Sequence, residues 1–453
     1  GINRFVLCGM GGSSLAPEVI TAAEGVTLVV LDSTNPEQVR AAIEADLANT
    51  AVIVSSKSGS TVETDSQKRA FEAAFDSASI DKRERIVVVT DPESPMETAA
   101  KNDGYRVFNA DPTVGGRYSA LTAFGLVPSG LAGADIGKLL SDARIAAESL
   151  SVDSVENPGL QLGAVLARSV NSETFRDKVG VVSAGSLIGF GNWVEQLVAE
   201  STGQQGKGVL PVVLETQSHE LGAGNPDLLV VRVVDKVLTS EGDETQVSGS
   251  LGEQFLLWEF ATVVASRLIG INPFDQPDVE SAKIAARGML ESRSAQSAPN
   301  FEDDGIEVRS NHLDLSGVYD IPTALAKLLA ELEDDGYLSI HCYLDRTTAV
   351  EAENLRNQFA KRSNRPTTFG WAPRFLHSTG QYHKGGPRQG VYLQLLSNKA
   401  RDLPIPGRSF SFGELIASQA AGDAKVLAAL GRPVLTLTLG DVAEGLSIIQ
   451  ASI

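Results

Sequence analysis

The sequence predicts an α/β protein built on doubly wound parallel sheets, and two observations support this fold class. Short runs of β-branched and other apolar residues alternate with helical patterns through the first third of the chain, and the same alternation returns later. The runs are continuously apolar, as parallel strands are when helices cover both faces of a sheet. Ligands of such sheets bind beyond the carboxyl ends of the strands. The loops that follow the strands are therefore where we expect a functional site.

The apolar runs fall into three successive parts of the chain. In the first part we expect strands at residues 5–8, 27–31, 51–55, 86–90 and 105–109. A stretch rich in Pro, Gly and Ser at 127–135 marks a boundary before a pair of long helices. In the second part we expect strands at 178–183, 209–214 and 228–234, and a helix at 253–268. A polar stretch at 292–304 precedes further expected strands at 306–309, 337–344, 391–396 and 434–439.

These parts predict two doubly wound domains, at residues 1–133 and 134–290, and an additional α/β segment at 291–453 that packs on the second domain. The length agrees with this division. A chain of 453 residues exceeds the roughly 250–300 residues at which a single hydrophobic core stops growing.

Composition excludes several classes of function. The chain has 38 Lys and Arg against 57 Asp and Glu, and a net charge of −19 opposes adhesion to nucleic acid or to an anionic membrane. A phosphorylated ligand would then depend on local donors. There is no apolar run of about 18 residues and no basic leader, which predicts a soluble cytoplasmic protein. Cys8 and Cys342 lie in apolar, strand-like runs, so we expect buried, reduced thiols.

The turn after the first expected strand imitates a dinucleotide-binding fingerprint. Its sequence is Gly9-Met10-Gly11-Gly12-Ser13-Ser14, and Asp32 follows about twenty residues later at the end of the second strand. The sixth position is Ser14 rather than Gly or Ala. Gly12 and Ser13 suit a backbone and hydroxyl contact to a sugar or a phosphate equally well. A nicotinamide dehydrogenase therefore stays open as an alternative.

The turn after the third expected strand is more informative. Ser60 and Glu63 have the spacing of a capping box, which predicts that a helix begins here with its free amide groups pointing at the loop. Lys57 adds an ammonium group. The hydroxyls of this turn belong to Ser55, Ser56, Ser58, Ser60 and Thr61. Together these groups predict an anion site for a phosphate monoester, with a merely polar turn as the alternative.

A buried carboxylate is the candidate general base. Helical geometry places Trp193, Leu197 and Glu200 on one face, whereas Glu195 points the other way. Burial of the Glu200 carboxyl would raise its pKa and suit it to general base catalysis near neutral pH. The alternative is a surface glutamate at a frayed helix end.

Three further cationic or titratable side chains are candidates for the site. Arg117 lies in Gly115-Gly116-Arg117-Tyr118-Ser119, a strand-to-helix turn where an arginine can stabilise a developing oxyanion. Lys283 lies on the apolar side of a helix expected to begin at Pro277, where a lone lysine usually extends to solvent. His377 stands out because it lies in a loop-like segment. The histidines lack metal-ligand spacing with a carboxylate partner, so we expect no metal.

Taken together, these motifs resemble the phosphoglucose isomerase family, whose members fold as two sugar-isomerase (SIS) domains. The motifs that carry the resemblance are Gly11-Gly12-Ser13, Ser56-Lys57-Ser58-Gly59-Ser60-Thr61, Gly115-Gly116-Arg117-Tyr118-Ser119, Ala199-Glu200-Ser201-Thr202-Gly203 with Gly206-Lys207-Gly208, and Phe274-Asp275-Gln276-Pro277-Asp278-Val279-Glu280 with Lys283. The resemblance implies an isomerase of glycolysis and gluconeogenesis that interconverts glucose 6-phosphate and fructose 6-phosphate through a cis-enediol(ate), without a cofactor.

The resemblance also implies a role for each matching residue. Glu200 would shuttle the proton between C2 and C1, and Arg117 would stabilise the enediolate. Lys283, with Gln276 nearby, would assist ring opening at the ring-oxygen and phosphate side. His377, in Leu376-His377-Ser378-Thr379-Gly380-Gln381, would help to open the ring from the neighbouring subunit of a homodimer. The phosphate would be held by Ser56, Lys57, Ser58 and Thr61.

The sequence departs from the family pattern in two ways. The histidine motif follows Lys283 instead of preceding it, and about 170 C-terminal residues have no place in an ordinary member. Those residues resemble the isomerase half of bacterial transaldolase/phosphoglucose isomerase fusions. Because the chain opens at Gly1 directly into a strand, we expect a missing N-terminal segment, which the resemblance would make a transaldolase domain; a stand-alone isomerase half is equally compatible.

We expect the C-terminal segment to complete the second domain and to deliver His377. Two further alternatives stay open. One is a dual phosphoglucose/phosphomannose isomerase, which differs only in the C2 epimers that it accepts. The other is a non-catalytic SIS regulator that binds sugar phosphate, which predicts a missing base or lysine, although both Glu200 and Lys283 are present.

Overall fold

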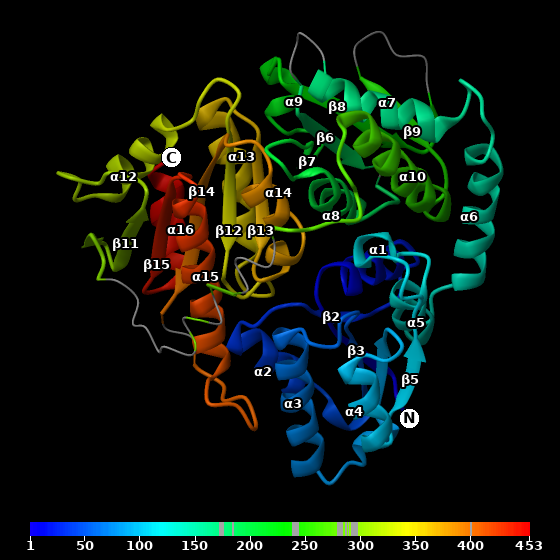
Figure 1. The fold of residues 1–453 in the computed structure, drawn as a ribbon. Coiled ribbons are helices and arrows are strands. Elements are labelled where there is room, and N and C mark those ends of the chain that lie inside the picture. The colour runs from blue at the N-terminus through cyan, green and yellow to red at the C-terminus, as the bar shows by residue number, and fades with distance from the viewer. Residues whose placement is uncertain are drawn as a thin grey trace.

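A computed structural model of the chain describes residues 1–171, 176–183, 185–237, 244–278, 284–285, 288, 290, 298–398 and 401–453. Across these residues the chain forms three sheets with helices packed against them (Figure 1). We call the sheets with their helices the N-terminal, middle and C-terminal units. The predicted α/β class with parallel sheets is confirmed.

The N-terminal unit contains a five-stranded parallel sheet with the order β2-β1-β3-β4-β5. Its strands are β1 (Arg4–Gly9), β2 (Val29–Leu31), β3 (Thr50–Ser55), β4 (Ile86–Thr90) and β5 (Arg106–Asn109). Its helices are α1 (Leu15–Ala23), α2 (Pro36–Glu44), α3 (Val62–Ser77), α4 (Pro95–Asp103) and α5 (Ala123–Ala132). The strand order reverses between β1 and β3, where Gly9 pairs with Ser55. The loops that leave these two strands therefore begin side by side at a topological switch point.

The middle unit contains a four-stranded parallel sheet with the order β7-β6-β8-β9. Its strands are β6 (Lys178–Ser183), β7 (Leu210–Leu214), β8 (Leu228–Val234) and β9 (Thr245–Ser248). Its helices are α6 (Ile136–Leu150), α7 (Pro158–Asn171), α8 (Phe190–Thr202), α9 (Glu220–Ala223) and α10 (Leu251–Ile269). A capping box of Ser250 and Glu253 starts α10. Trp193 of α8 packs edge-to-face on Phe255 of α10, with ring centroids 4.6 Å apart.

The C-terminal unit contains a mixed six-stranded sheet with the order β10-β11-β15-β14-β12-β13. Its strands are β10 (Phe301–Asp303), β11 (Ile306–Asn311), β12 (Tyr337–Cys342), β13 (Thr367–Trp371), β14 (Gly390–Ser397) and β15 (Val434–Leu439). Strand β11 is antiparallel to both of its neighbours, β10 and β15, whereas β12 to β15 pair in parallel. Its helices are α12 (Ile321–Ala330), α13 (Asn354–Ser363), α14 (Gly380–Gly385), α15 (Phe412–Ala429) and α16 (Val442–Ala451).

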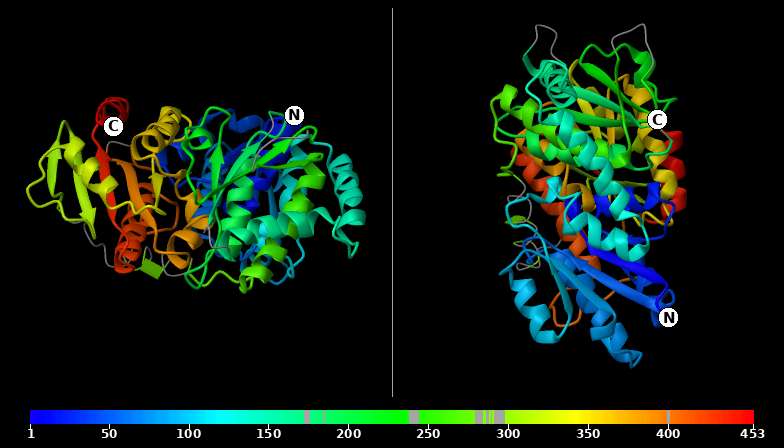
Figure 2. Two further views of the ribbon diagram at one scale, coloured as in Figure 1. Left: turned by 90° about the horizontal axis from the view of Figure 1, so that it is seen from above. Right: turned by 90° about the vertical axis from the view of Figure 1, so that its right-hand side faces the viewer.

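The C-terminal unit contacts both other units, which are stacked on one another in Figures 1 and 2. Tyr382 and Tyr392 share a buried apolar cluster with β7 of the middle unit. Ile405 and Phe412 extend the core of the N-terminal unit, and Arg408 forms an ion pair of 2.6 Å with Asp65 of α3. The three sheets lie within residues 1–133, 134–290 and 291–453, although these domain boundaries themselves stay a prediction.

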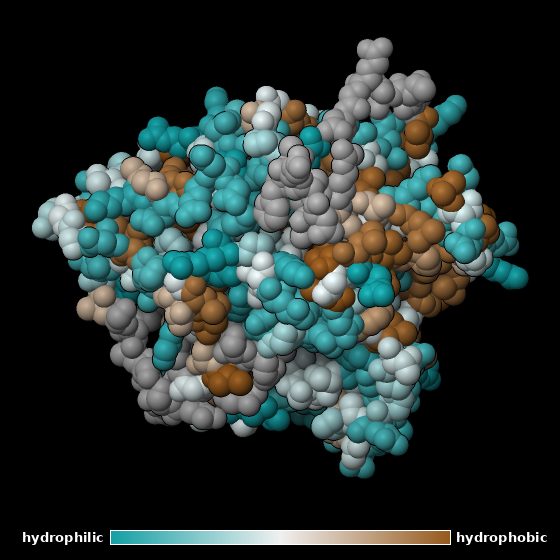
Figure 3. Space-filling model, turned by 45° about the horizontal axis from the view of Figure 1, so that its top comes forward, coloured by the Kyte–Doolittle hydropathy of each residue, from teal (hydrophilic) through white to brown (hydrophobic). Residues whose placement is uncertain are grey.

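The molecular surface is mostly hydrophilic, as the charged composition requires. Figure 3 shows hydrophobic side chains gathered on one part of a face, toward the side where α6 and α10 lie in Figure 1. Among the described residues, no helix combines the length and apolar character needed to cross a bilayer. Cys8 and Cys342 are both buried and free, as predicted.

Two local predictions were wrong or incomplete. The capping box of Ser60 and Glu63 does not form, because α3 begins at Val62 and the Glu63 carboxylate is hydrogen-bonded elsewhere. The boundary expected within 127–135 coincides with the end of α5, which continues through Pro128 to Ala132, and α6 begins at Ile136. Strands β9, β10 and β13 were not predicted. Of the helix expected from Pro277, the described residues 284, 285, 288 and 290 are helical, whereas its other positions beyond residue 278 lie outside the described residues.

Candidate functional site

The doubled glycine after β1 allows two other loops to approach closely. A Cβ atom added to Gly12 would lie 2.1 Å from the carbonyl oxygen of Gly116, in the turn after β5. Gly11 has a φ of +56°, and its added Cβ would lie 2.6 Å from the carbonyl oxygen of His377. These glycines are therefore required where three backbone segments meet.

Asp32, the acidic residue of the dinucleotide-like pattern, already has a partner in the structure. The Asp32 side chain is 1% exposed and forms an ion pair with Arg374 of the C-terminal unit. A dinucleotide fingerprint needs this acid free to accept a hydrogen bond from the ribose. The observed pairing argues against a nicotinamide cofactor at this position.

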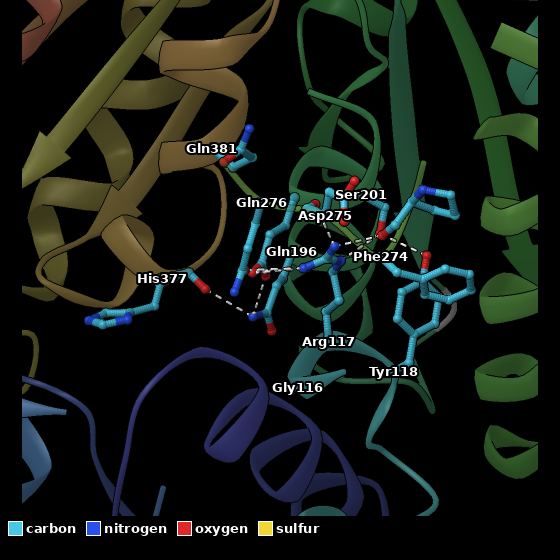
Figure 4. Close-up of polar contacts among 12 residues, drawn as sticks. Gly116, Arg117, Tyr118, Gln196, Ser201, Phe274, Asp275, Gln276, His377 and Gln381 are labelled. Atoms are coloured by element: carbon cyan, nitrogen blue, oxygen red, sulfur yellow. Dashed lines mark hydrogen bonds and ion pairs between the residues drawn. The ribbon is translucent and has the colours of Figure 1, made fainter. Parts of the chain in front are cut away.

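Glu200 and Arg117 form the centre of the site (Figure 4). Glu200 lies in α8 and is 7% exposed, which confirms its predicted burial, and Arg117 is 4% exposed. Arg117 Nη1 lies 3.1 Å from Glu200 Oε1. The N-terminal unit thus supplies the cation, and the middle unit supplies the carboxylate.

The other guanidinium donors of Arg117 fix its orientation. Nε donates to the Ser201 hydroxyl at 2.9 Å, and Nη2 donates to the carbonyl oxygens of Pro273 and Asp275 at 2.6 and 2.9 Å. Nη1 also donates to Gln276 Oε1 at 3.2 Å. Because every nitrogen of the fork has an acceptor, the guanidinium is held in one plane beside the Glu200 carboxylate.

Tyr118 supports this arrangement from the neighbouring position. Its hydroxyl shares a hydrogen bond of 2.9 Å with Ser201, and its ring packs on Phe274 with centroids 5.4 Å apart. Burial raises the pKa of Tyr118 to about 12, so the phenol stays neutral at physiological pH.

Gln196 connects Glu200 to the His377 segment. Its side-chain amide donates to Glu200 Oε2 at 3.0 Å and to the backbone carbonyl of His377 at 2.9 Å. Figure 4 shows this carbonyl facing Gln196 while the imidazole points away from Arg117. Gln196 lies one turn before Glu200, so the face argument applied to Glu200 could have identified it from the sequence.

The imidazole of His377 contacts the N-terminal unit of the same chain. Its Nε2 lies 2.9 Å from Glu63 Oε1, in the first turn of α3. Gln419 of α15 also donates to Glu63 Oε1, at 2.7 Å, and accepts a hydrogen bond from Thr34 at 2.8 Å. Glu63 and His377 are 314 positions apart, and no local pattern predicts that they meet.

The predicted phosphate loop lies between β3 and α3. Ser56 is buried, and its hydroxyl shares a hydrogen bond of 3.0 Å with Thr61 and accepts one from the Gly59 amide at 3.2 Å. Ser58 is exposed at the tip of the loop, where it accepts a hydrogen bond from Ser60. The loop therefore presents hydroxyl groups at the first turn of α3, beside the Glu63 that contacts His377.

Lys57 of this loop already has a partner. Its ammonium forms an ion pair of 2.5 Å with Asp91 and donates to the carbonyl of Pro112 at 3.2 Å. A phosphate bound at the loop would compete with Asp91 for this cation. Ser13, also predicted as a ligand contact, is buried in the turn after β1.

Lys283 lies outside the described residues, and Gln381 of the His377 motif reaches the segment just before it. Gln381 Nε2 donates to the Gly203 carbonyl and to the Asp278 carboxylate, each at 2.8 Å, and Gln381 Oε1 accepts from the Asp278 amide at 3.0 Å. The C-terminal unit thus holds the end of the described 271–278 turn. In the part of the chain that the structure describes, no cluster of three or more His, Cys, Asp or Glu side chains is placed to hold a metal ion.

Comparison with known proteins finds one family, which matches the N-terminal unit and part of the middle unit. The family model described as phosphoglucose isomerase matches residues 1–209. A probable glucose-6-phosphate isomerase of Natronomonas pharaonis is 31% identical over 333 residues, which cover 62% of this chain and 78% of that relative. The glucose-6-phosphate isomerase of Rubrobacter xylanophilus is 29% identical over 352 residues, covering 62% of this chain and 81% of its own length.

Solved structures agree with these relatives. A hypothetical protein of Thermus thermophilus aligns with a TM-score of 0.58 at 26% identity over 64% of this chain and 84% of its own. A glucose-6-phosphate isomerase of Chlamydia trachomatis aligns with a TM-score of 0.55 at 20% identity, over 65% of this chain and 71% of its own, and supports the fold alone. The coverage of 78% of a relative at 31% identity, with a matching family model, shows that this chain belongs to the phosphoglucose isomerase family.

Proposed function

We propose that the chain interconverts glucose 6-phosphate and fructose 6-phosphate by moving a proton between C2 and C1 through a cis-enediol(ate). The observation that carries this proposal is the buried Glu200 carboxylate beside the fixed guanidinium of Arg117, at 3.1 Å. The names of the relatives support the substrate pair.

In the proposed reaction Glu200 removes the proton from C2 of the open-chain aldose. The C2–H bond breaks, a double bond forms between C1 and C2, and the aldehyde oxygen becomes the enediolate oxygen. Glu200 then returns the proton to C1, while the O2 proton moves to O1 and C2 becomes the ketone. The negative charge passes from the carboxylate to the substrate and stays beside Arg117 throughout, which stabilises the transition state.

The remaining site residues are assigned to binding and ring opening. Ser56, Ser58 and Thr61 would bind the phosphate at the first turn of α3, with Lys57 moving from Asp91 to the ligand. Gly12 and Ser13 would contact the sugar phosphate from the neighbouring loop at the switch point. Their support is the position of both loops at the carboxyl ends of β1 and β3.

Ring opening needs an acid and a base near the ring oxygen. His377 would exchange a proton there, with Glu63 holding its imidazole at 2.9 Å. Lys283 and Gln276 would act at the ring-oxygen and phosphate side. Support for Gln276 is its contact with Arg117 at 3.2 Å.

The test is the conversion of fructose 6-phosphate to glucose 6-phosphate, coupled to NADP reduction by an added dehydrogenase. Glu200→Gln should lower kcat by about 10²- to 10⁴-fold, because a positioned general base contributes that much. Glu195→Gln, an identical change on another face of the same helix, is the matched control and should keep its activity. Equal activity of both variants would refute Glu200 as the base.

The same assay separates the alternatives. Turnover of mannose 6-phosphate would indicate a dual phosphoglucose/phosphomannose isomerase. Binding of fructose 6-phosphate by the unmodified chain without any turnover would support a non-catalytic regulator instead.

A further inference from the structure

A cluster of four charged side chains joins the N-terminal and C-terminal units behind the His377 turn. Glu18 of α1 and Asp32 after β2 supply two carboxylates, and Arg346 after β12 and Arg374 supply two guanidinium groups. Arg374 Nη2 lies 2.6 Å from Glu18, and Arg374 Nε bonds to Asp32. Arg346 Nη1 lies 2.9 Å from Glu18, and Arg346 Nη2 lies 3.8 Å from Asp32.

The contacts of Arg374 are shielded from solvent. Arg374 is 8% exposed and Asp32 is 1% exposed. Burial alone would lower the pKa of the Arg374 guanidinium, but the charges of Asp32 and Glu18 more than offset this and raise it. A buried, hydrogen-bonded ion pair of this kind is costly to break from one side, because the remaining charge is left without a partner.

Arg374 begins the short turn that ends at His377. This 3₁₀ turn, Arg374–His377, makes three contacts in different directions. Arg374 binds the acids of the N-terminal unit, Phe375 stacks on His341 of the C-terminal sheet at a centroid distance of 3.9 Å, and His377 contacts Glu63. Because Arg374 and His377 are the two ends of one four-residue turn, a shift of the Arg374 backbone would also move the His377 imidazole.

The turn borders a cavity on one side. The cavity has a volume of about 290 Å³ and is lined by Arg374 and Phe375 of the turn, by Ser378 just after it, and by Glu195 and Asn192 of α8. Side chains that line a cavity have fewer packed neighbours on that side. The ionic contacts of Arg374 therefore contribute more to holding the turn in place.

We propose that Arg374 is a positioning residue, which places the His377 imidazole at Glu63 by anchoring the His377 turn to Asp32 and Glu18. The proposal rests on the proposed isomerase function, in which His377 opens the sugar ring. Asp32, which the sequence pattern offered as a ribose-binding acid, is in this view the anchor of a catalytic turn.

Arg346 provides a matched control for this proposal. It contacts the same two carboxylates from the loop after β12, which does not carry His377. Arg346→Gln and Arg374→Gln each remove one guanidinium from the same cluster. Both should lower thermal stability, whereas only Arg374→Gln should change the chemistry.

The experiment is a double-mutant cycle of Arg374→Gln and His377→Ala, measured as kcat/KM for fructose 6-phosphate and as its pH profile. Arg374→Gln alone should lose about 10²-fold, as expected for misplacement of a catalytic group by about 1 Å. Adding it to His377→Ala should change the rate by less than about 3-fold, because the group that it positions is already gone. Arg374→Lys should recover part of the loss and of the pH profile.

Independent, multiplicative losses in the cycle, or an equal loss in Arg346→Gln, would overturn the proposal. If Arg374→Gln does not fold, Asp32→Asn weakens the same contact from the other side and should give the same non-additivity with His377→Ala. Failure of the isomerase function itself would appear as inactivity of the unmodified chain, so the two failures are distinguishable.

Discussion

Glu195 and Glu200 lie on one helix, five residues apart, in different surroundings. The Glu200 carboxylate accepts hydrogen bonds from Arg117 and Gln196. Glu195 lines the cavity behind the His377 turn, where loss of hydration raises the pKa of its carboxyl to about 8, and the charges of Arg356 and Arg374 offset this only in part. Two carboxylates of one helix thus differ in their partners, because Glu200 is held by hydrogen bonds and Glu195 faces a cavity.

The raised pKa of Glu195 makes the stability of the protein depend on pH. Between its ordinary pKa of 4.5 and about 8, the folded Glu195 holds a proton that the unfolded chain has lost. Folding stability contributed by this group therefore falls as the pH rises through that range. The unfolding free energy of Glu195→Gln should fall less between pH 5 and pH 9 than that of the unmodified chain, as measured by urea unfolding at both pH values. A pH dependence identical to that of the unmodified chain would contradict the assignment.

Three short turns from different parts of the chain meet at the candidate site. They are the turn after β1 (Gly11–Ser13), the turn after β5 (Gly116–Tyr118) and the His377 turn (Arg374–His377). The first has to be glycine-rich because the other two pack directly on its backbone. The glycines of the Gly-x-Gly-Gly pattern thus allow three turns to pack against one another, and this packing explains the pattern without a bound nucleotide.

Gly12→Ala should separate the turn after β1 from the turn after β5. The new Cβ would lie 2.1 Å from the Gly116 carbonyl, so the backbone that carries Arg117 has to move. We expect kcat to fall by about 10²-fold, because the oxyanion donor shifts relative to Glu200. Gly116→Ala is the control, since its Cβ would meet no atom within 4 Å. Comparable kinetics for the two variants would show that the contact does not position Arg117.

For the whole molecule, the C-terminal unit completes the site within one chain. The family resemblance implied a histidine from a neighbouring subunit of a homodimer, but His377 here contacts Glu63 of its own chain. The C-terminal unit reaches the N-terminal unit through Arg374 and Arg408, and the middle unit through Gln381. We therefore expect His377 to act in the chain that carries it, whether or not the protein is a homodimer.

Mixing two inactive variants tests this expectation. Glu200→Gln and His377→Ala chains, co-expressed and purified together, should show no more activity than either variant alone if each site is built from one chain. If the histidine crossed to a partner subunit, mixed dimers would regain one intact site, and roughly a quarter of full activity would return for random pairing. Purified mixtures of separately tagged chains confirm that both variants are present in one particle.

The sequence by itself determined most of the architecture and the candidate base. Continuous apolar runs predicted every strand of the two parallel sheets except β9, because burial on two faces leaves a local signature. The strand-end rule located the loops of Ser56 and Arg117, and helical periodicity predicted the burial of Glu200. Short strands such as β13 were not predicted, because two buried residues followed by three partly buried ones form neither an alternating nor a continuously apolar pattern.

Only the tertiary structure decided how the site is closed. In the structure His377 pairs with Glu63, Arg374 with Asp32 and Lys57 with Asp91. Glu63 therefore does not form the capping box, and Asp32 is not free to bind a ribose, although local spacing suggested both. Such pairs are separated by tens to hundreds of residues. They depend on how the units dock, which the periodicity of any one segment does not encode, because that periodicity records only which face is buried and not which partner buries it.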